Sequence, residues 1–94
     1  AFNSKEVLLI ELTGFQVMGG LLNNFVSALL NKEHVTSNKY KQLLPNKYLG
    51  KNREWDNDFY KQLLMITAYV SQMTDSYALD LYRNTSGMSL PAIE

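Results

Sequence analysis

The sequence predicts an all-α fold of three to four helices. Apolar residues recur every three or four positions across residues 14–30 and 54–72, the spacing that places them along one side of a helix. Pro45, Gly50 and Gly87 interrupt the pattern and indicate where helices end. We expect one short strand at most, near residues 7–12, and a single segment over residues 1–94 with no internal boundary.

The apolar run at residues 7–12, VLLIEL, has the length of a strand and contains two β-branched residues. It predicts a strand, although a short buried helical segment has the same pattern. Thr13 followed by Gln16 matches the capping box, in which a hydroxyl and a glutamine three residues later satisfy free backbone groups. We therefore expect the first helix to begin at about Gly14 and to end near Leu30.

A wide apolar face is the main feature of this first helix. Gly19 and Gly20 interrupt it, and each glycine costs about 1 kcal/mol relative to alanine within a helix. We interpret the pair as close packing against another element, with a kink as the alternative. The apolar positions are Phe15, Val17, Met18, Leu21, Leu22, Phe25, Val26, Leu29 and Leu30.

The middle of the chain is polar. Residues 31–38 predict a connection, and a short helix over residues 37–44 should end before Pro45. Residues 46–53 predict a loop, because Gly50 and two asparagines favour turns.

Two further helices are expected toward the end of the chain. The first should run from about Glu54 to Gln72, with its early acidic residues at the positive end of the helix dipole. The second should run from Thr74, as its cap, to Ser86, with a stop at Gly87 and an extended tail around Pro91. The predicted apolar face of residues 54–72 comprises Phe59, Leu63, Leu64, Ile66, Tyr69 and Val70. Apolar faces this wide indicate a surface that meets a larger protein or another subunit.

The composition excludes several classes of protein. Nine basic and nine acidic residues give no net charge, which argues against a dedicated nucleic-acid binder. No cysteine is present, so disulfides and thiolate metal sites are excluded, and a reducing compartment such as the cytoplasm is expected. No apolar run reaches the ~20 residues that a membrane helix needs. Residues 1–6 do not have the pattern of a signal peptide and lack an initiator methionine, so we expect a chain cut from a longer one, with methionine removal before Ala1 as the alternative.

Motifs for autonomous catalysis are missing from the sequence. His34 is the only histidine, and a structural zinc site needs about four nitrogen or sulfur donors, so we predict a solvated loop histidine. The sequence contains no Gly-x-Ser-x-Gly, no P-loop and no dinucleotide fingerprint. We therefore assign no catalytic residue and no metal ligand in this segment.

Two segments remain as candidate binding sites. Lys47, Lys51 and Arg53, with Tyr48 and Trp55 nearby, could hold a phosphate or stack on a base. The alternative is a solvated basic loop beside a half-buried tryptophan.

The other candidate segment is MTDSYALDLYR, at residues 73–83. Tyr77, Ala78 and Leu81 share one helical face and predict core packing, while Arg83 suits the negative end of the helix. Asp75 is expected to bond first-turn amides, or alternatively to face a ligand.

Two blocks of sequence carry a family resemblance. The first is VLLIELTGFQV at residues 7–17 followed by GLL at 20–22, and the second is YKQLL at 60–64 with YVSQMTDSYALDLYR at 69–83. Together they resemble the C-terminal part of bacterial deoxyguanosine triphosphate triphosphohydrolases, members of the HD-domain phosphohydrolase superfamily. The resemblance covers most of this chain but only the final fraction of such an enzyme.

The resemblance implies a fragment of a larger helical HD-type fold that hydrolyses a deoxynucleoside triphosphate to the deoxynucleoside and triphosphate. The family holds its metal with a His…His-Asp…Asp signature, which is not in this sequence. The resemblance therefore implies a divalent cation of the Mg²⁺ or Mn²⁺ type in the missing core. It also implies a homo-oligomer that responds to a nucleotide or single-stranded DNA. We expect a structural and oligomerisation role, with Arg53, Asp75 and Tyr77 as candidate nucleotide contacts. The alternative is a stand-alone small helical protein-interaction module.

Overall fold

The computed structural model describes residues 3–86, which form four α-helices. Two 3-10 turns lie between α2 and α3: η1, Asn46–Tyr48, and η2, Lys51–Arg53. No strand occurs within these residues, which confirms the all-α prediction. The helices are α1, Ser4–Leu30; α2, Val35–Leu43; α3, Phe59–Ser71; and α4, Asp75–Thr85.

The predicted strand at residues 7–12 is wrong, because α1 runs unbroken through this segment. The side chain of Asn3 accepts a hydrogen bond from the backbone N–H of Glu6 at 2.8 Å and so begins the helix. Thr13 is not a cap, since its hydroxyl donates to the carbonyl oxygen of Leu9 at 2.9 Å from inside the helix. With a cap at Asn3 and no turn residue before Gly14, the apolar run continues as helix.

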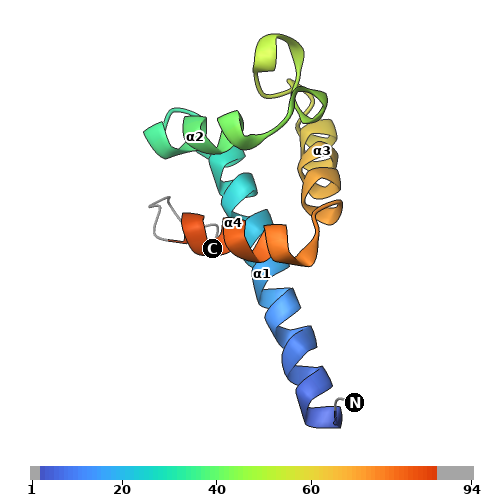
Figure 1. Ribbon diagram of the computed structural model, residues 1–94. Helices are drawn as coiled ribbons and strands as arrows, with labels where there is room; N and C mark the ends of the chain where they lie inside the picture. Colours follow the sequence, from blue (N-terminus) through green and yellow to red (C-terminus); the bar gives the residue numbers. More distant parts are fainter. Residues whose placement is uncertain (1–2, 87–94) are drawn as a thin grey trace.

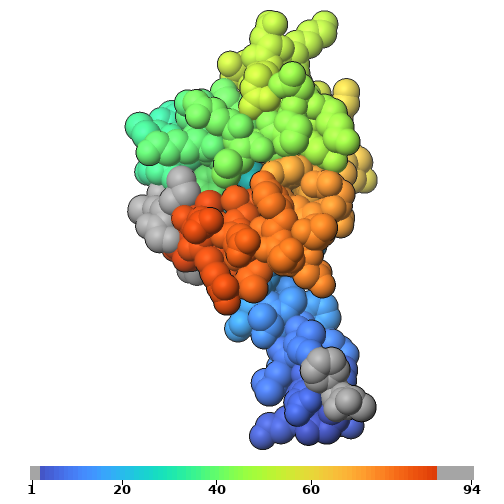
Figure 2. Space-filling model, in the orientation of Figure 1, coloured from blue at the N-terminus to red at the C-terminus, as the bar shows by residue number. Residues whose placement is uncertain are grey.

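Figure 1 shows that the other three helices surround the second half of α1. α4 crosses α1 near its middle, and the first half of α1 projects from the body as an arm. The arm is plainly visible in the space-filling view (Figure 2), and the described residues extend over 48 × 25 × 21 Å. Among the helices of residues 3–86, none combines the length and the apolar character that a membrane crossing requires.

Aromatic rings occupy the centre of the core. The ring of Phe25, from α1, makes edge-to-face contacts with Tyr40 of α2 at 5.3 Å and Tyr69 of α3 at 5.7 Å between centroids. Tyr48, from η1, packs against Tyr69 at 5.3 Å. Aliphatic side chains surround this cluster: Val17, Leu21, Ala28, Leu29, Leu44, Leu49, Ile66, Val70 and Ala78.

The buried faces differ in part from those predicted. Leu21, Phe25 and Leu29 are buried as expected, but Phe15 is 72% exposed because it lies on the projecting arm. Leu64 of α3 is also exposed, whereas the polar Gln62 is fully buried. Hydrophobic spacing alone therefore located the helices but did not say which apolar side chains the other helices cover.

The predicted starts of the two helices in the middle of the chain are wrong. α2 begins at Val35, because the Nδ1 atom of His34 accepts the Thr36 amide at 3.1 Å, so this histidine is an N-cap rather than a solvated loop residue. α3 begins at Phe59 and not at Glu54, because the carboxylate of Asp58 is the N-cap.

The cap at Thr74 is confirmed. Its hydroxyl accepts the Tyr77 amide at 3.2 Å and begins α4 at Asp75. The predicted stop at Gly87 and the extended tail around Pro91 lie outside the described residues.

The two central glycines have different surroundings. A Cβ atom on Gly20 would overlap the ring of Tyr82 from α4, whereas a Cβ on Gly19 would meet no atom within 4 Å. The close-packing interpretation is therefore confirmed at Gly20, where the missing side chain lets α4 cross α1. Both residues lie within the unbroken α1.

We predict opposite effects for alanine at the two glycines. Gly19→Ala should raise the free energy of unfolding by about 1 kcal/mol, because alanine favours the helix and meets no neighbour. Gly20→Ala should lower it by about 1–3 kcal/mol, because the new methyl group displaces Tyr82. Urea unfolding followed by circular dichroism measures both. Equal effects of the two substitutions would contradict the packing at Gly20.

Candidate functional site

The basic residues lie on the loop between α2 and α3. Gly50 closes this loop: its amide donates to the carbonyl of Glu54 at 2.8 Å, and a Cβ at this position would meet the backbone of Asp56 at 3.0 Å. Asn52 and Arg53 have left-handed backbone angles, with φ of 59° and 58°. Such a backbone is unfavourable for arginine, so side-chain contacts must hold it there.

Those contacts engage the guanidinium of Arg53. One terminal nitrogen donates to the side chain of Asn46, and the other donates to the carbonyls of Lys41 and Gln42 at 3.3 Å each. Arg53 thus satisfies carbonyl groups at the end of α2, where a cation is favoured. These three bonds use only part of the five N–H donors that a guanidinium has.

The remaining charges of the loop are partly engaged as well. The Lys47 ammonium lies 5.1 Å from the centre of the Tyr48 ring, and Lys41 forms an ion pair with Glu54 at 2.7 Å. Lys51 lies on η2 and is exposed. The predicted half-buried tryptophan is found, because Trp55 packs against the core.

Gln62 joins this loop to α3. Its amide nitrogen donates to the carbonyl of Tyr48 at 2.9 Å, and its amide oxygen accepts the N–H of Asp56 at 2.6 Å. Two distant points of the loop are therefore held by one buried side chain. The acidic residues expected at the start of α3 belong to the same hydrogen-bond network, because the Asp56 carboxylate accepts the Asp58 amide at 2.8 Å.

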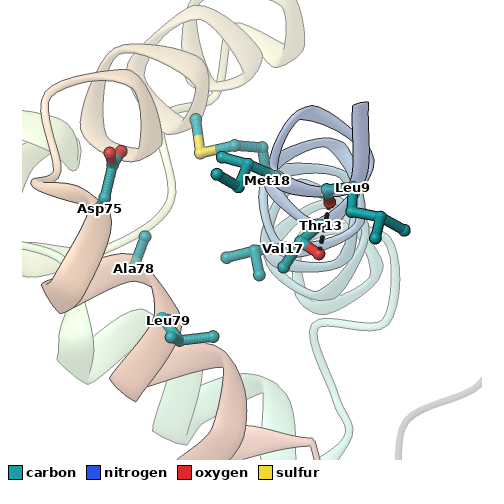
Figure 3. A pocket seen from close by; sticks show the side chains of 9 residues that line it. Leu9, Thr13, Val17, Met18, Asp75, Ala78 and Leu79 are labelled. Carbon is teal, nitrogen blue, oxygen red and sulfur yellow. Dashed lines mark hydrogen bonds between the residues drawn. The ribbon is translucent and has the colours of Figure 1, made fainter. Parts of the chain in front are cut away.

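A hollow between α1 and α4 is the main concavity beside the second candidate segment. Figure 3 shows Asp75, Ala78 and Leu79 on the α4 side, facing Val17 and other α1 residues. Its volume is about 370 Å³, and Asp75 carries the only charge among its lining residues. The α1 side is formed by Leu9, Ile10, Thr13, Gly14, Val17 and Met18.

Tyr77 points away from this hollow. Its hydroxyl lies 3.4 Å from that of Tyr69, which also donates to the carbonyl of Leu43 at 3.4 Å. Tyr77 is 48% exposed, so the predicted core packing holds for its neighbour Ala78 but not for Tyr77. Burial and the Tyr77 hydroxyl raise the pKa of Tyr69, because both favour the neutral phenol.

The three predicted nucleotide contacts come from two segments of the chain. Arg53 precedes α3, while Asp75 and Tyr77 follow it. Tyr77 nevertheless reaches the end of α2 through the Tyr69 hydroxyl, and Arg53 bonds the same end directly. Figure 1 shows the two segments at opposite ends of α3. Within residues 3–86, no group of three His, Asp or Glu side chains is placed to hold a metal ion.

Comparison with known proteins identifies relatives of the sequence. A deoxyguanosinetriphosphate triphosphohydrolase-like protein of Synechocystis is 34% identical over 90 residues, which are 95% of this chain and 20% of the relative. Proteins with the same description in Listeria monocytogenes and Pseudomonas aeruginosa PAO1 are 29% and 31% identical over 94% and 97% of this chain.

The chain is homologous to part of the deoxyguanosinetriphosphate triphosphohydrolase-like proteins. This finding confirms the resemblance stated for residues 7–22 and 60–83. The chain spans only about a fifth of the length of these relatives. No family model matches the chain, and no solved structure matches it.

Sequence reasoning missed the α1 side of the hollow, because it assigned Leu9 and Ile10 to a strand. One signal could have revealed the helix: Asn3 followed by Glu6 has the spacing of a capping box. A helix begun there places Thr13 and Val17 on the same side as Leu9, at steps of four residues. Gln62 was missed because a polar residue inside a helical pattern is normally assigned to the solvent side.

We predict that Gln62→Leu lowers the free energy of unfolding by about 1–3 kcal/mol, because it leaves the Tyr48 carbonyl and the Asp56 amide without their partner. Chemical unfolding followed by Trp55 fluorescence measures the effect. The exposed Gln42→Leu is the matched control and should stay within about 0.5 kcal/mol of the parent. Equal stability of the two variants would show that Gln62 does not anchor the loop.

Tyr69 should make the stability fall at high pH. The Tyr69 phenol loses its proton near pH 10 in the unfolded chain but retains it to higher pH in the folded chain. Its contribution to the free energy of unfolding is therefore fully present below about pH 10 and is lost as the pH rises further. Tyr69→Phe should flatten that fall in urea unfolding between pH 8 and 11.5. Tyr60→Phe, at a ring that is 69% exposed, is the control. An unchanged slope in Tyr69→Phe would refute the assignment.

Proposed function

We propose that this chain is the C-terminal segment of a metal-dependent deoxynucleoside triphosphate (dGTP) triphosphohydrolase. In this proposal it supports the catalytic core and the homo-oligomer and does not supply the catalytic groups. The observation that carries the proposal is the identity of about 30% to hydrolase-like relatives over nearly all of this chain but a fifth of theirs.

The chemistry of the proposed reaction requires more than this segment offers. Hydrolysis of a triphosphate ester is assisted by a divalent cation, which activates water and offsets phosphate charge. The sequence has one histidine, and that residue caps α2. In the proposal, a cation of the Mg²⁺ or Mn²⁺ type is therefore held by the rest of the longer enzyme, in the cytoplasm.

Contacts with a nucleotide are proposed at three residues. The exposure of Asp75 and Tyr77 on α4 supports such a role. Arg53 would act with the guanidinium donors that its bonds to the end of α2 leave. A nucleotide or single-stranded DNA effector would find the exposed Lys47 and Lys51 on the same loop.

The alternative function is a stand-alone helical interaction module. Exposed apolar residues on α1 are compatible with this alternative too. The two proposals differ in one expected result. Only the segment proposal requires this chain to restore the activity of a related hydrolase from which the matching segment has been deleted.

A segment-exchange experiment tests the proposal. The Synechocystis relative is prepared intact, with the matching segment deleted, and with that segment replaced by this chain. We expect deletion to lower metal-dependent dGTP hydrolysis at least roughly tenfold and to change the oligomer, and we expect the exchange to restore both. Phosphate-product assays with Mg²⁺ or Mn²⁺ and light scattering measure these properties.

The isolated 94-residue chain serves as the control. It should show no hydrolysis above background with either cation. Robust hydrolysis by the isolated chain would overturn the proposal. Full activity and an unchanged oligomer after deletion would do the same and would favour the interaction module.

A further inference from the structure

The arm of α1, residues 4–16, carries an unusual concentration of exposed apolar side chains. Val7, Leu8, Leu9 and Ile10 are 40%, 58%, 55% and 56% exposed, and Phe15 is 72% exposed. Between residues 7 and 20 the only charged residue is Glu11. Soluble proteins rarely leave so contiguous an apolar surface in water, so the arm requires a covering partner.

The exposed residues encircle the arm. Four consecutive residues, separated by about 100° each, span about 300° of a helix circumference. Val7 and Ile10 continue the side of α1 that enters the core through Leu21. Leu8 and Leu12 fall on the opposite side, which faces away from that continuation. A helix that is apolar all round is normally enclosed on all sides.

The hollow between α1 and α4 continues the core side of the arm. Leu9 and Ile10 line it together with Ala78 and Leu79, so its apolar walls join the arm to the body (Figure 3). A small molecule in this hollow would leave Leu12 and Phe15 uncovered. A single helix from a second copy would cover one side of the arm and leave the other exposed. The occupant must therefore be polypeptide that reaches both sides.

We infer that the arm is inserted between apolar helices of the remaining four-fifths of the longer hydrolase-like protein, one of which also fills the hollow beside α4. This inference rests on the proposed function and adds the surface through which the segment is attached. The relatives contain the necessary polypeptide, because this chain matches only 20–22% of their length. The occupant is thus apolar protein within the same chain, contacting Ile10 on one side and Leu12 on the other.

Thiol labelling on the two sides of the arm tests the inference. The chain has no cysteine, so Ile10→Cys and Leu12→Cys each introduce one thiol into it. Each variant is labelled with a maleimide in the free chain and in the segment-exchange enzyme, and the labelled peptide is identified by mass spectrometry. Asn38→Cys, at an exposed polar position of α2, is the matched control.

We expect labelling of both arm thiols to slow by roughly 100-fold or more in the exchange enzyme, with the control within about threefold of its rate in the free chain. Rapid labelling of both in an exchange enzyme that hydrolyses dGTP would overturn the inference and leave the proposed function standing. Protection on one side only, increasing with protein concentration, would overturn it in favour of a second copy.

The intact Synechocystis relative provides a second measurement, independent of whether the exchange enzyme folds. Cysteines at the residues aligned with Ile10 and Leu12 should be protected there to the same extent. Rapid labelling of either position in the active relative would overturn the inference by itself. Loss of hydrolysis with both thiols still protected would instead count against the proposed function alone.

Discussion

The contact on which the rest of the fold depends is the aromatic cluster around Phe25. Its ring lies at 0% exposure between Tyr40 and Tyr69, so three helices meet at one side chain of α1. The two tyrosines then extend the contact to the fourth helix: the Tyr40 hydroxyl donates to the carbonyl of Thr85 at 3.5 Å, and the Tyr69 hydroxyl approaches that of Tyr77. Edge-to-face ring pairs stabilise beyond their buried area, so one cluster fixes the positions of all four helices.

This cluster also explains the asymmetry of the molecule. It lies in the second half of α1, and the body is packed around that half, while Gly20 lets α4 cross at close range. Before this crossing, α1 has no further helix of residues 3–86 to pack against and becomes the arm (Figure 2). Packing around Phe25 therefore creates a core at the second half of α1 and leaves an apolar surface on the first half. The chain matches only about a fifth of the length of its relatives.

The sequence was sufficient for the helical class and for the packing role of Gly20, because spacing and side-chain size carry that information locally. It was insufficient at positions decided by tertiary contacts. Val7 to Leu12 has β-branched residues and strand length, and only the cap at Asn3 decides for the helix. Phe15 satisfies the helical pattern, yet it is exposed because it lies on the arm of α1, which the other helices of residues 3–86 do not cover. No local pattern could show that Arg53 bonds carbonyls of α2, since those atoms are brought together by the loop.

The distribution of polar groups fits the structural role proposed for this segment. Two buried polar side chains of this segment are committed to structure: Gln62 holds the loop, and the Thr85 hydroxyl donates to the carbonyl of Leu81 at 2.6 Å. Catalytic groups instead need exposure to a substrate and a pKa suited to proton transfer. The pKa of Tyr69 and that of Tyr40 are both raised by burial, which keeps these phenols neutral and makes them structural hydrogen-bond donors. In the proposed enzyme, these side chains would hold the segment in position, and the apolar arm would attach it to the remaining polypeptide.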